Sequence, residues 1–249
     1  MLKNEREREI LTILQTLGYS TVKSLSEQLY GSESGVRRAL AGLESKGLVR
    51  RSYGGAELLS GHTNVAAFGA RTYQHADAKQ AIAKKATPLV EDGSIVFFDG
   101  SSTSFYLAQH LLKKTALTVV TNNTEILDLF AKTKFTVYCS GGKLSDNNRT
   151  CLIGPDARRS FEHIYAQYAF FSGNALSADG VITDCTREEV EVREAMLAHA
   201  QTTVFLCDSS KFDQLSTYRQ CTLGEIDMLV SENDDAKRFS TLFPRLTIR

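Results

Sequence analysis

The chain of 249 residues lacks a long apolar run, a low-complexity tract and an internal repeat. No stretch approaches the length of a membrane span, and the first ten residues, MLKNEREREI, are charged rather than apolar. We therefore expect a soluble, cytoplasmic protein with no membrane partner. The length allows one or two domains, and the part after the first 55 residues can bury a core of its own.

Disulfide and metal-binding patterns are missing as well. The five cysteines are odd in number and never fall in a C-x-x-C spacing, which argues against a disulfide framework and a zinc site. They are Cys139, Cys151, Cys185, Cys207 and Cys221. No G-x-x-x-x-G-K-S/T run is present, so a nucleotide-binding P-loop is not indicated. We expect neither a metal ion nor a cofactor.

Charge is balanced over the whole chain, with 29 Lys and Arg against 29 Asp and Glu, but it is distributed unevenly. Residues 1–55 contain nine basic and six acidic side chains, a net charge of +3, so the remainder carries −3. The neutral total therefore hides a basic N-terminal part, which is typical of a segment that binds nucleic acid.

The same N-terminal part shows three successive helical patterns. Apolar residues recur at helical spacing over residues 4–17, where Gly18 supplies a stop, and again from Val22 to Leu29, with Thr21 or Ser20 as the cap. Tyr30 and Gly31 break the second pattern, and a third begins near Ser32. The predicted buried faces are formed by Ile10, Leu11, Ile13, Leu14, Leu17, Val22, Leu25, Leu29, Val36, Leu40 and Leu43.

A basic ribbon follows the third helix. Gly47 ends that helix, residues 48–53 are typical of a short strand, and Gly54-Gly55 allows a tight turn, so the whole is a winged helix-turn-helix. Arg side chains on the third helix suit a guanine edge, and serines at its start suit phosphate. The alternative is that these charges are only a solvated face. The candidate DNA-binding residues are Ser32, Ser34, Arg37, Arg38, Lys46, Arg50, Arg51 and Tyr53.

After a helical stretch at residues 76–86, ended by Pro88, apolar strand patterns alternate with helical ones. The strands are predicted in SIVFF, LTVVT, FTVYCS, YAFFSG and TVFLCD, and a helix is predicted over residues 105–112. Alternation of this kind predicts an α/β domain with a mostly parallel sheet, whose ligands lie beyond the carboxyl ends of the strands. Polar clusters stand at those ends: DGSSTS (99–104), TNN (121–123), SGGK (140–143), SG (172–173) and DSSK (208–211).

The cluster DGSSTS has the chemistry of an anion-binding loop. Gly100 allows close approach of the backbone, hydroxyl groups can donate, and the following helix presents free amide groups. Lys211 adds a cation from another strand end. Taken alone, the loop could equally be a turn with a helix cap. The polar clusters at the neighbouring strand ends favour the ligand site.

The N-terminal residues resemble the head of DeoR-type bacterial transcription regulators. The family pattern VSEATIRRDLNELEEQGLLRRVHGGA corresponds to GSESGVRRALAGLESKGLVRRSYGGA here. Two departures stand out, Gly35 for Thr and Ala39 for Asp. Glycine inside a helix costs about 1 kcal/mol relative to alanine and removes a possible hydroxyl contact, so the family's operator preference is not transferred.

The resemblance extends over the body, through DGSSTS, Thr121-Asn122, Gly141-Gly142 with Gly154-Pro155, FFSG, Glu189 with Met196, and DSSKF. It implies a ribose-5-phosphate-isomerase-like effector domain that binds a phosphorylated sugar or sugar acid. The resemblance places Gly100, Ser101, Ser102, Thr103 and Lys211 on phosphate, and Asp99, Asn122, Gly173 and Glu189 on carbohydrate hydroxyls. Ser104, Gly141 and Gly142 complete the candidate effector-binding residues.

We therefore expect residues 1–56 to form the DNA-binding domain, 57–74 a linker, and 75–249 an effector and oligomerisation domain. The predicted function is a ligand-gated repressor of a carbohydrate operon that binds double-stranded operator DNA as a homodimer or homotetramer. One alternative is a sugar-phosphate isomerase or deaminase, with Asp99, Asp179, Asp184 or Glu189 as base. Isomerase motifs of the DGADE and KGxGG types are absent, and we expect no catalytic residue. A constitutive architectural DNA-binding protein would explain the head but not the polar strand ends.

Overall fold

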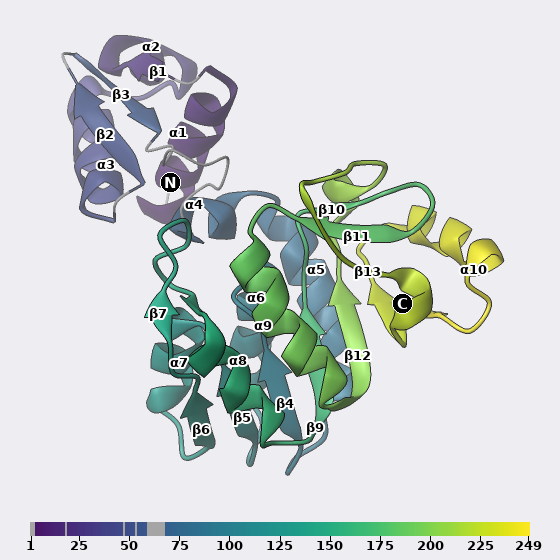
Figure 1. Cartoon of the computed structure of the whole chain (residues 1–249). Coiled ribbons are helices and arrows are strands. Elements are labelled where there is room, and N and C mark those ends of the chain that lie inside the picture. The colour runs from purple at the N-terminus through teal and green to yellow at the C-terminus, as the bar shows by residue number, and fades with distance from the viewer. Residues whose placement is uncertain (1–2, 18, 47, 53, 59–67) are drawn as a thin grey trace. The chain divides into compact units, whose positions relative to one another are not determined.

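The computed structural model describes residues 3–17, 19–46, 48–52, 54–58 and 68–249. Gly18 and Gly47, expected at helix ends, lie outside the described residues, and so do Tyr53 and much of the expected linker. The chain divides into two compact units, residues 1–74 and residues 75–249. Each unit is described by itself (Figure 1).

The first unit is a winged helix-turn-helix, as predicted. Its elements are α1 (Lys3–Leu17), β1 (Tyr19–Thr21), α2 (Val22–Gln28), α3 (Glu33–Ser45), β2 (Val49–Ser52), β3 (Gly55–Leu58) and α4 (Phe68–Tyr73). Thr21 caps α2 by accepting a hydrogen bond from Ser24 N at 3.1 Å, and Ser32 caps α3 by accepting one from Gly35 N at 3.2 Å. The turn between the two helices contains Tyr30, whose φ of 47° is unusual for a residue with a side chain.

The wing is a three-stranded antiparallel sheet in the order β1-β3-β2. Gly54, with φ of +73°, supplies the turn between β2 and β3 that the Gly54-Gly55 pair predicts. The sequence indicated only the strand that became β2. The wing packs on a core formed by Ile10, Leu11, Leu14, Val22, Leu25, Val36, Ala39, Leu40, Leu43, Leu48, Val49, Ala56 and Ala70.

The segment expected as a linker is not irregular throughout. Its first residues, Glu57 and Leu58, belong to β3, and α4 follows at Phe68–Tyr73. Ala70 is buried in the core of the first unit, and Gly69 lies so close to Leu48 that a Cβ there would be 2.8 Å from Leu48 Cδ2. Helix α4 is therefore part of the first unit rather than a free connection.

A parallel sheet of seven strands forms the centre of the second unit, in the order β15-β14-β12-β9-β4-β5-β6. Every pairing in it is parallel. The strands are β4 (Ile95–Phe98), β5 (Thr118–Thr121), β6 (Thr136–Cys139), β9 (Ala166–Phe171), β12 (Ala200–Leu206), β14 (Met228–Val230) and β15 (Thr247–Ile248). Since Phe98 pairs with Thr121 and Phe170, the first polar residues after β4, β5 and β9 meet at one edge.

Helices cover both faces of this sheet (Figure 1). They are α5 (Ala76–Ala86), α6 (Ser102–Leu111), α7 (Thr124–Ala131), α8 (Pro155–Glu162), α9 (Arg187–Ala198) and α10 (Phe239–Leu242). Side chains of α5, α6 and α7 pack with Val96 and Phe98 on one face, and those of α8 and α9 pack with Phe97 on the other. The alternation along β4 explains why its sequence is apolar throughout. Helix α6 begins at Ser102, three residues before the predicted start, because Ser101 is its cap.

A small antiparallel sheet, which the sequence did not indicate, covers the remainder of the second face. Its strands are β10 (Ala175–Leu176), β11 (Val181–Asp184) and β13 (Tyr218–Thr222), and Ile182 and Cys221 pack on Phe171 and Phe205. A separate antiparallel pair consists of β7 (Lys143–Leu144) and β8 (Leu152–Ile153). Four short 3-10 helices complete the unit: η1 (Thr87–Leu89), η2 (Ser209–Lys211), η3 (Leu223–Glu225) and η4 (Asp234–Arg238).

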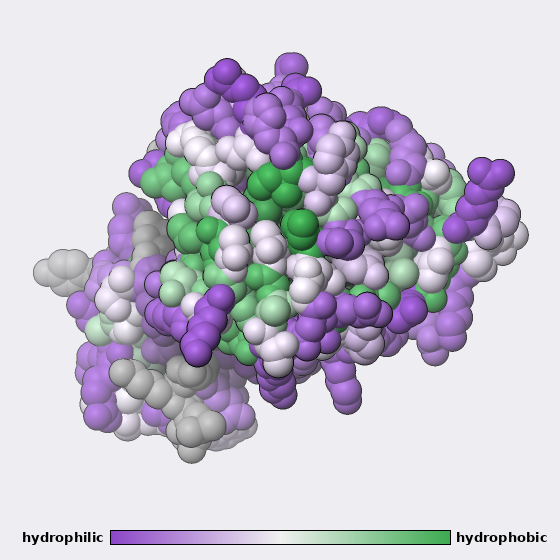
Figure 2. Space-filling view, turned by 90° about the horizontal axis from the view of Figure 1, so that it is seen from below, coloured by the Kyte–Doolittle hydropathy of each residue, from purple (hydrophilic) through white to green (hydrophobic). Residues whose placement is uncertain are grey.

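The view from below shows apolar residues gathered in the middle of one face of the second unit, with polar side chains around them (Figure 2). Tyr165 and Leu112 are among the exposed large apolar side chains of this unit, at 76% and 40% exposure. Within the described part of the chain, no helix is long and apolar enough to cross a membrane.

Candidate DNA-binding face and effector site

Helix α3 separates its charged and apolar residues as a DNA-reading helix requires. Val36 and Leu40 are fully buried in the core of the first unit, whereas Ser34, Arg37 and Arg38 are exposed. Ser32, the cap, lies 3.2 Å from Ser34 between their hydroxyl oxygens. Hydroxyl groups and two arginines therefore share one accessible face, a set of donors that suits phosphate and base edges.

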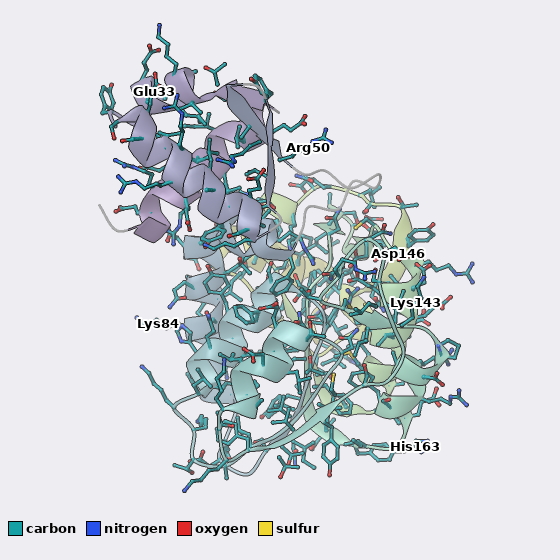
Figure 3. All side chains as sticks on the ribbon, turned by 90° about the vertical axis from the view of Figure 1, so that its left-hand side faces the viewer. Glu33, Arg50, Lys84, Lys143, Asp146 and His163 are labelled. Atoms are coloured by element: carbon teal, nitrogen blue, oxygen red, sulfur yellow. The ribbon has the colours of Figure 1, made fainter. Side chains whose placement is uncertain are left out.

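Three of the four predicted DNA-binding arginines form ion pairs within the first unit. Arg37 pairs with Glu33 at 2.6 Å, Arg51 with Glu44 at 2.6 Å, and Arg50 with Glu57 at 2.7 Å. Figure 3 shows Glu33 at the start of α3 and Arg50 projecting outward from β2. All three pairs are solvent-exposed, and such pairs contribute only about 0–1 kcal/mol. The arginines are therefore free to exchange a carboxylate for a phosphate at small cost.

The recognition helix and the wing form a continuous surface. Arg37 and Arg51 line an open depression of about 290 Å³ together with Glu44, Gly54 and Gly55. The hydrogen bond that Arg51 N donates to Glu44 lowers the pKa of that carboxyl group, and the guanidinium of Arg51 lowers it further. The carboxylate thus holds the wing against α3.

Lys46, the residue at the C-terminal cap of α3, pairs with α1. Its ammonium group donates to Glu7 Oε2 at 2.7 Å, and the side chain of Glu7 is only 2% exposed. This hydrogen bond raises the pKa of Lys46 despite the opposing effect of partial burial. Lys46 therefore neutralises a buried carboxylate of α1. Tyr53, the remaining predicted residue, is outside the described part of the chain.

In the second unit, Asp99 joins the ends of several elements. One carboxylate oxygen, Oδ1, accepts hydrogen bonds from the hydroxyls of Ser101 and Ser104, each at 2.6 Å. The other, Oδ2, accepts from Ser172 N at 3.1 Å and from Arg193 Nε at 3.2 Å. Asp99 is 2% exposed. Both oxygens are engaged by the protein, so Asp99 organises the strand end rather than presenting a free carboxylate.

The loop DGSSTS is a turn with a helix cap and also has features of an anion site. Ser101 Oγ accepts a hydrogen bond from Ser104 N at 3.1 Å and so caps α6. The hydroxyls of Ser101 and Ser104 are used within the loop. Ser102 and Thr103 are buried in the first turn of α6, and the Oγ1 atom of Thr103 has no hydrogen-bond partner. The loop can therefore be both a turn that caps α6 and part of an anion-binding site.

Gly100 is required by close packing. A Cβ at this position would lie 2.5 Å from Cys151 Sγ, and Asn148 Nδ2 donates to the Gly100 carbonyl oxygen at 3.4 Å. Asn122 donates to the same sulfur at 3.1 Å and to Leu152 O at 2.9 Å, while its Oδ1 is buried without a partner. Cys151 thus connects the ends of β4 and β5.

Lys211 reaches the same edge from the end of β12. Its ammonium group donates to Ser172 Oγ at 2.8 Å and lies 3.5 Å from Asp208 Oδ2. Burial tends to raise the pKa of Asp208, but Lys211, a hydrogen bond from Ser210, and the charges of Lys79 and His75 together lower it. The side chain of Lys211 is 19% exposed, so its ammonium group remains accessible from solvent.

Arg193 is a central residue that the sequence did not reveal. Its side chain is 3% exposed and pairs with Asp99 at 3.2 Å and with Asp184 at 3.0 Å, and it donates to Gln220 Oε1 at 2.9 Å. Burial would lower its pKa, yet Asp184, Asp99 and Glu189 raise it above the ordinary value. Its position was detectable in principle, because Glu189, Val192, Arg193 and Met196 share one helical face on which a charged pair is unexpected.

The structure thus brings most of the predicted effector residues together. Glu189 is buried beside Arg193 in the first turns of α9, and Gly173 packs tightly, since a Cβ there would be 3.0 Å from Ile182 Cγ2. Gly141 and Gly142 are separate. Both are exposed after β6, where Gly141 N donates to Ser160 Oγ at 3.1 Å, and among the described residues neither glycine forms a hydrogen bond with Asp99 or its partners.

The other acidic candidates have structural partners. Asp184 pairs with Arg193, and Asp179 accepts a hydrogen bond from Ser177 Oγ. Over the described ranges, no group of three or more His, Cys, Asp or Glu side chains is arranged to hold a metal ion. All five cysteines are free. Burial raises the pKa of the Cys221 thiol to about 12 and that of Cys207 further still.

Solved structures with a related arrangement are distant in sequence. The crystal structure of eIF2B delta from Chaetomium thermophilum is 18% identical and covers 64% of this chain and 57% of its own, with a TM-score of 0.47. A D-ribose-5-phosphate isomerase in complex with phospho-erythronic acid is 15% identical and covers 56% of each chain, with a TM-score of 0.41.

Curated relatives cover nearly the whole chain. The HTH-type transcriptional regulator GlpR of Haloferax volcanii is 30% identical over 93% of this chain and 91% of its own. The HTH-type transcriptional repressor CsqR of Escherichia coli is 30% identical over 92% and 87%, and the repressor GlcR of Bacillus subtilis is 29% identical over 98% and 94%.

The two family models that match correspond to the two units of the chain. The DeoR-like helix-turn-helix domain matches residues 6–61, and the DeoR C terminal sensor domain matches residues 74–233. Residues 6–61 carry the exposed arginines of α3 and the wing, and residues 74–233 carry the Asp99 network. The chain therefore belongs to the DeoR family and is a DNA-binding transcriptional regulator with a C-terminal sensor domain.

Proposed function

We propose that the protein represses a carbohydrate-utilisation operon and that a phosphorylated sugar or sugar acid, bound at the carboxyl edge of the parallel sheet, controls its operator binding. The observation that carries the proposal is the convergence of three strand ends. Lys211 Nζ lies 2.8 Å from Ser172 Oγ, and Ser172 N lies 3.1 Å from Asp99 Oδ2. These residues follow β12, β9 and β4, the arrangement in which parallel sheets bind ligands.

Residues near Lys211 are suited to an anion. The ammonium group is accessible enough to exchange its bond to Ser172 for a phosphate oxygen, and the first turn of α6 contributes amide groups and the hydroxyl of Thr103. Arg193 and Asp99 form a buried ion pair, and Asp99 in turn binds the hydroxyl groups of the DGSSTS loop. We assign phosphate to Lys211, Gly100, Ser102 and Thr103, and assign Ser101 and Ser104 to the loop itself.

Names of relatives agree with a sugar-derived signal. One relative, 29% identical over 96% of this chain, is the lactose phosphotransferase system repressor of Staphylococcus epidermidis. A repressor that reads paired half-sites needs two heads, so we propose a homodimer or homotetramer assembled through the second unit. The ligand then binds one arrangement of the chains better than another and shifts the population.

The experiment is a thermal-shift screen of the full chain with phosphorylated sugars, polyols and sugar acids, followed by titration of operator DNA. A ligand that binds the native state raises the melting temperature. Lys211→Ala is expected to abolish the shift and leave DNA affinity unchanged. Lys143→Ala is the matched control, because Lys143 is an exposed lysine after β6 that pairs with Asp146 at 2.7 Å (Figure 3). An unchanged dose response in Lys211→Ala would remove Lys211 from the site.

Catalysis is the second candidate, since a carboxylate beside a sugar carbonyl could move a proton. The geometry gives it little support, because Asp99 and Asp184 are both engaged by Arg193. Incubation of the protein with each stabilising sugar phosphate is expected to leave the compound unchanged. Formation of an isomer, detected by NMR, would establish an enzyme.

A further inference from the structure

The flank of α3 that faces α1 is made of small residues. Gly35, Ala39 and Gly42 stand at helical spacing of four and three, where the DeoR-type pattern has Thr, Asp and Glu. Gly35 and Ala39 are buried, and a Cβ on Gly42 would lie 2.7 Å from Glu7 Oε1. Side chains of α1 thus occupy space that larger residues of α3 would fill.

The side chain of Arg6 occupies that space near the start of α3. A Cβ on Gly35 would lie 2.5 Å from Arg6 Nη1, and a Cβ on Gly31 would lie 3.0 Å from Arg6 Nη2. The family pattern has Thr at the position of Gly35 and Val at that of Gly31. The guanidinium group of Arg6 therefore lies where those two side chains would otherwise lie, and neither glycine can gain a side chain without moving it.

The guanidinium group has no charge partner within the part of the chain that the structure describes. Its neighbour Glu7 is paired with Lys46 at 2.7 Å, and Glu33 is paired with Arg37 at 2.6 Å. Among the described residues Arg6 takes part in no ion pair, and its Nε atom is buried without a hydrogen-bond acceptor. A half-buried cation without a partner is unfavourable in the free protein, so an external anion would stabilise it.

The location of the guanidinium decides which anion that is. The hydroxyl of Ser32 lies 3.2 Å from the same Cβ position on Gly35, and Ser34 follows on the exposed face with Arg37 and Arg38. Side chains around the start of a recognition helix meet the sugar-phosphate backbone of the duplex. The anion within reach is therefore a DNA phosphate.

We infer that Arg6 is a DNA-contacting residue supplied by α1, and that its guanidinium binds a backbone phosphate beside the start of α3. Glycine at positions 35 and 31 leaves the space that the guanidinium group of Arg6 occupies. The hydroxyl contact that is lost with Gly35 is replaced by a cationic one. The consequence is a coupling between position 35 and position 6 that a chain with Thr at position 35 does not have.

The first test compares Arg6→Ala with Arg8→Ala in the full chain. Arg8 is an exposed residue of the same helix, two positions along, so both variants lose one positive charge. The probes are a duplex of random sequence and a duplex selected from a random pool by the wild-type protein. Arg6→Ala is expected to weaken binding to both about fivefold near physiological salt, and to reduce the slope of log K against log salt by about 1.

Equal effects of Arg6→Ala and Arg8→Ala would overturn the proposal, because the loss would then be one of net charge. A loss confined to the selected duplex would overturn the phosphate assignment and make Arg6 a base contact. Circular dichroism melting of both variants checks that the first unit is folded. Arg6→Gln keeps most of the stem and is expected to show the same loss if Arg6→Ala melts early.

The second test uses the coupling with Gly35. Gly35→Ala displaces the guanidinium, because the new Cβ would lie 2.5 Å from Arg6 Nη1, and it adds no hydroxyl group. It also improves helix propensity, so the fold is retained. In the wild-type background it is expected to weaken binding to the random duplex by the same factor as Arg6→Ala. In the Arg6→Ala background it is expected to cause no further loss, because the displaced group is already absent. Equal losses in both backgrounds would show that the two positions act independently and would refute the inference.

Discussion

At the scale of single residues, close packing accounts for features that the chemistry of the side chains does not. Gly100 was predicted to allow close approach of the backbone to an anion. Its φ is not in the left-handed region, and the atom that a Cβ there would meet first is the sulfur of Cys151. The same sulfur receives the amide of Asn122. A methyl group at position 100 would therefore disturb the ends of β4 and β5 together.

Gly100→Ala is expected to destabilise the second unit by about 1–3 kcal/mol, as overpacking of a filled site does. The measurement is urea denaturation of the full chain with and without Cys151→Ala. Removing the sulfur leaves Cys151 Cβ 3.3 Å from the new methyl group, so the double variant should lose less than the sum of the single ones. Gly141→Ala is the control, with its nearest atom at 3.6 Å. Additive losses would mean that the sulfur is not the obstacle.

Asp208 gives a dependence on pH. Although its burial opposes ionisation, Lys211, Ser210, Lys79 and His75 lower its pKa in the folded protein below the ordinary value of 3.8. A lowered pKa means that the carboxylate stabilises the fold above about pH 4, and that this contribution is lost as the pH falls through the folded-state pKa.

The melting temperature of the second unit should therefore fall on acidification from about pH 5 to pH 3, and less steeply in Asp208→Asn than in the wild type. Asp128→Asn removes an exposed carboxylate that pairs with Lys132 and should follow the wild-type curve. A parallel course for all three proteins would show that Asp208 is not responsible.

At the scale of helices and strands, elements long enough to show a regular apolar pattern could be predicted from the sequence, and shorter ones could not. Strands β4, β5, β9 and β12 are buried on both faces, so their apolar runs were plain, and α5 has the predicted bounds of Ala76–Ala86. Strands β10 and β15 contain two residues each, too few for any period, and β14 contains three. Local pattern also gave no information about which loops would meet.

The same limit applies to the candidate site. Polar residues after each strand could be listed from the sequence, because parallel strands end at one edge. Their partners could not, since Arg193 of α9 bonds to Asp99, which follows β4 and is 94 residues away along the chain, in a contact that only tertiary structure creates. Gly141 and Gly142 also follow a parallel strand, but that strand, β6, lies at the edge of the sheet.

Arg193→Met tests how α9 is held. The variant leaves Asp99 and Asp184 buried without their partner, and breaking a buried pair costs about 3–5 kcal/mol. Urea denaturation of the full chain should show this loss in the transition of the second unit. Arg187→Met on the same helix breaks the exposed pair with Glu191 and should cost no more than about 1 kcal/mol. Similar losses of unfolding free energy for the two variants would mean that the buried ion pairs of Arg193 stabilise the unit no more than an exposed pair does.

Glu57→Gln tests how the wing is restrained. Arg50 is 67% exposed and pairs with Glu57 on the neighbouring strand. Removing the carboxylate frees Arg50 and removes repulsion of phosphate, so affinity for random duplex DNA should increase by roughly two- to fivefold, more at low salt. Glu225→Gln frees Arg219 of the second unit in the same way and should leave affinity unchanged. Equal increases for both variants would indicate an effect of net charge alone.

At the scale of the whole molecule, each chain carries one recognition helix on a unit of 74 residues. A module of this size buries only about 600–1,000 Å² on DNA, which is too little for tight and specific binding alone. A second head held nearby binds intramolecularly, at an effective concentration in the millimolar range when the linkage spans the two sites. A sensor unit that joins two heads therefore supplies affinity as well as the signal.

The resulting prediction concerns the operator. Sequences selected by the full chain from a random pool should contain two inverted half-sites whose centres are about 10 base pairs apart, or a multiple of that. Sedimentation should find two chains on each such duplex, or four on a pair of them, and a duplex with one half-site should bind at least 100-fold more weakly because the second head has no partner site.

A stabilising sugar phosphate should reduce affinity for the paired sites far more than for the single one, since it acts on the arrangement of the heads and not on the face of α3. Equal reduction on both duplexes would place the effect of the ligand within each head, and one chain on each duplex would exclude the paired arrangement.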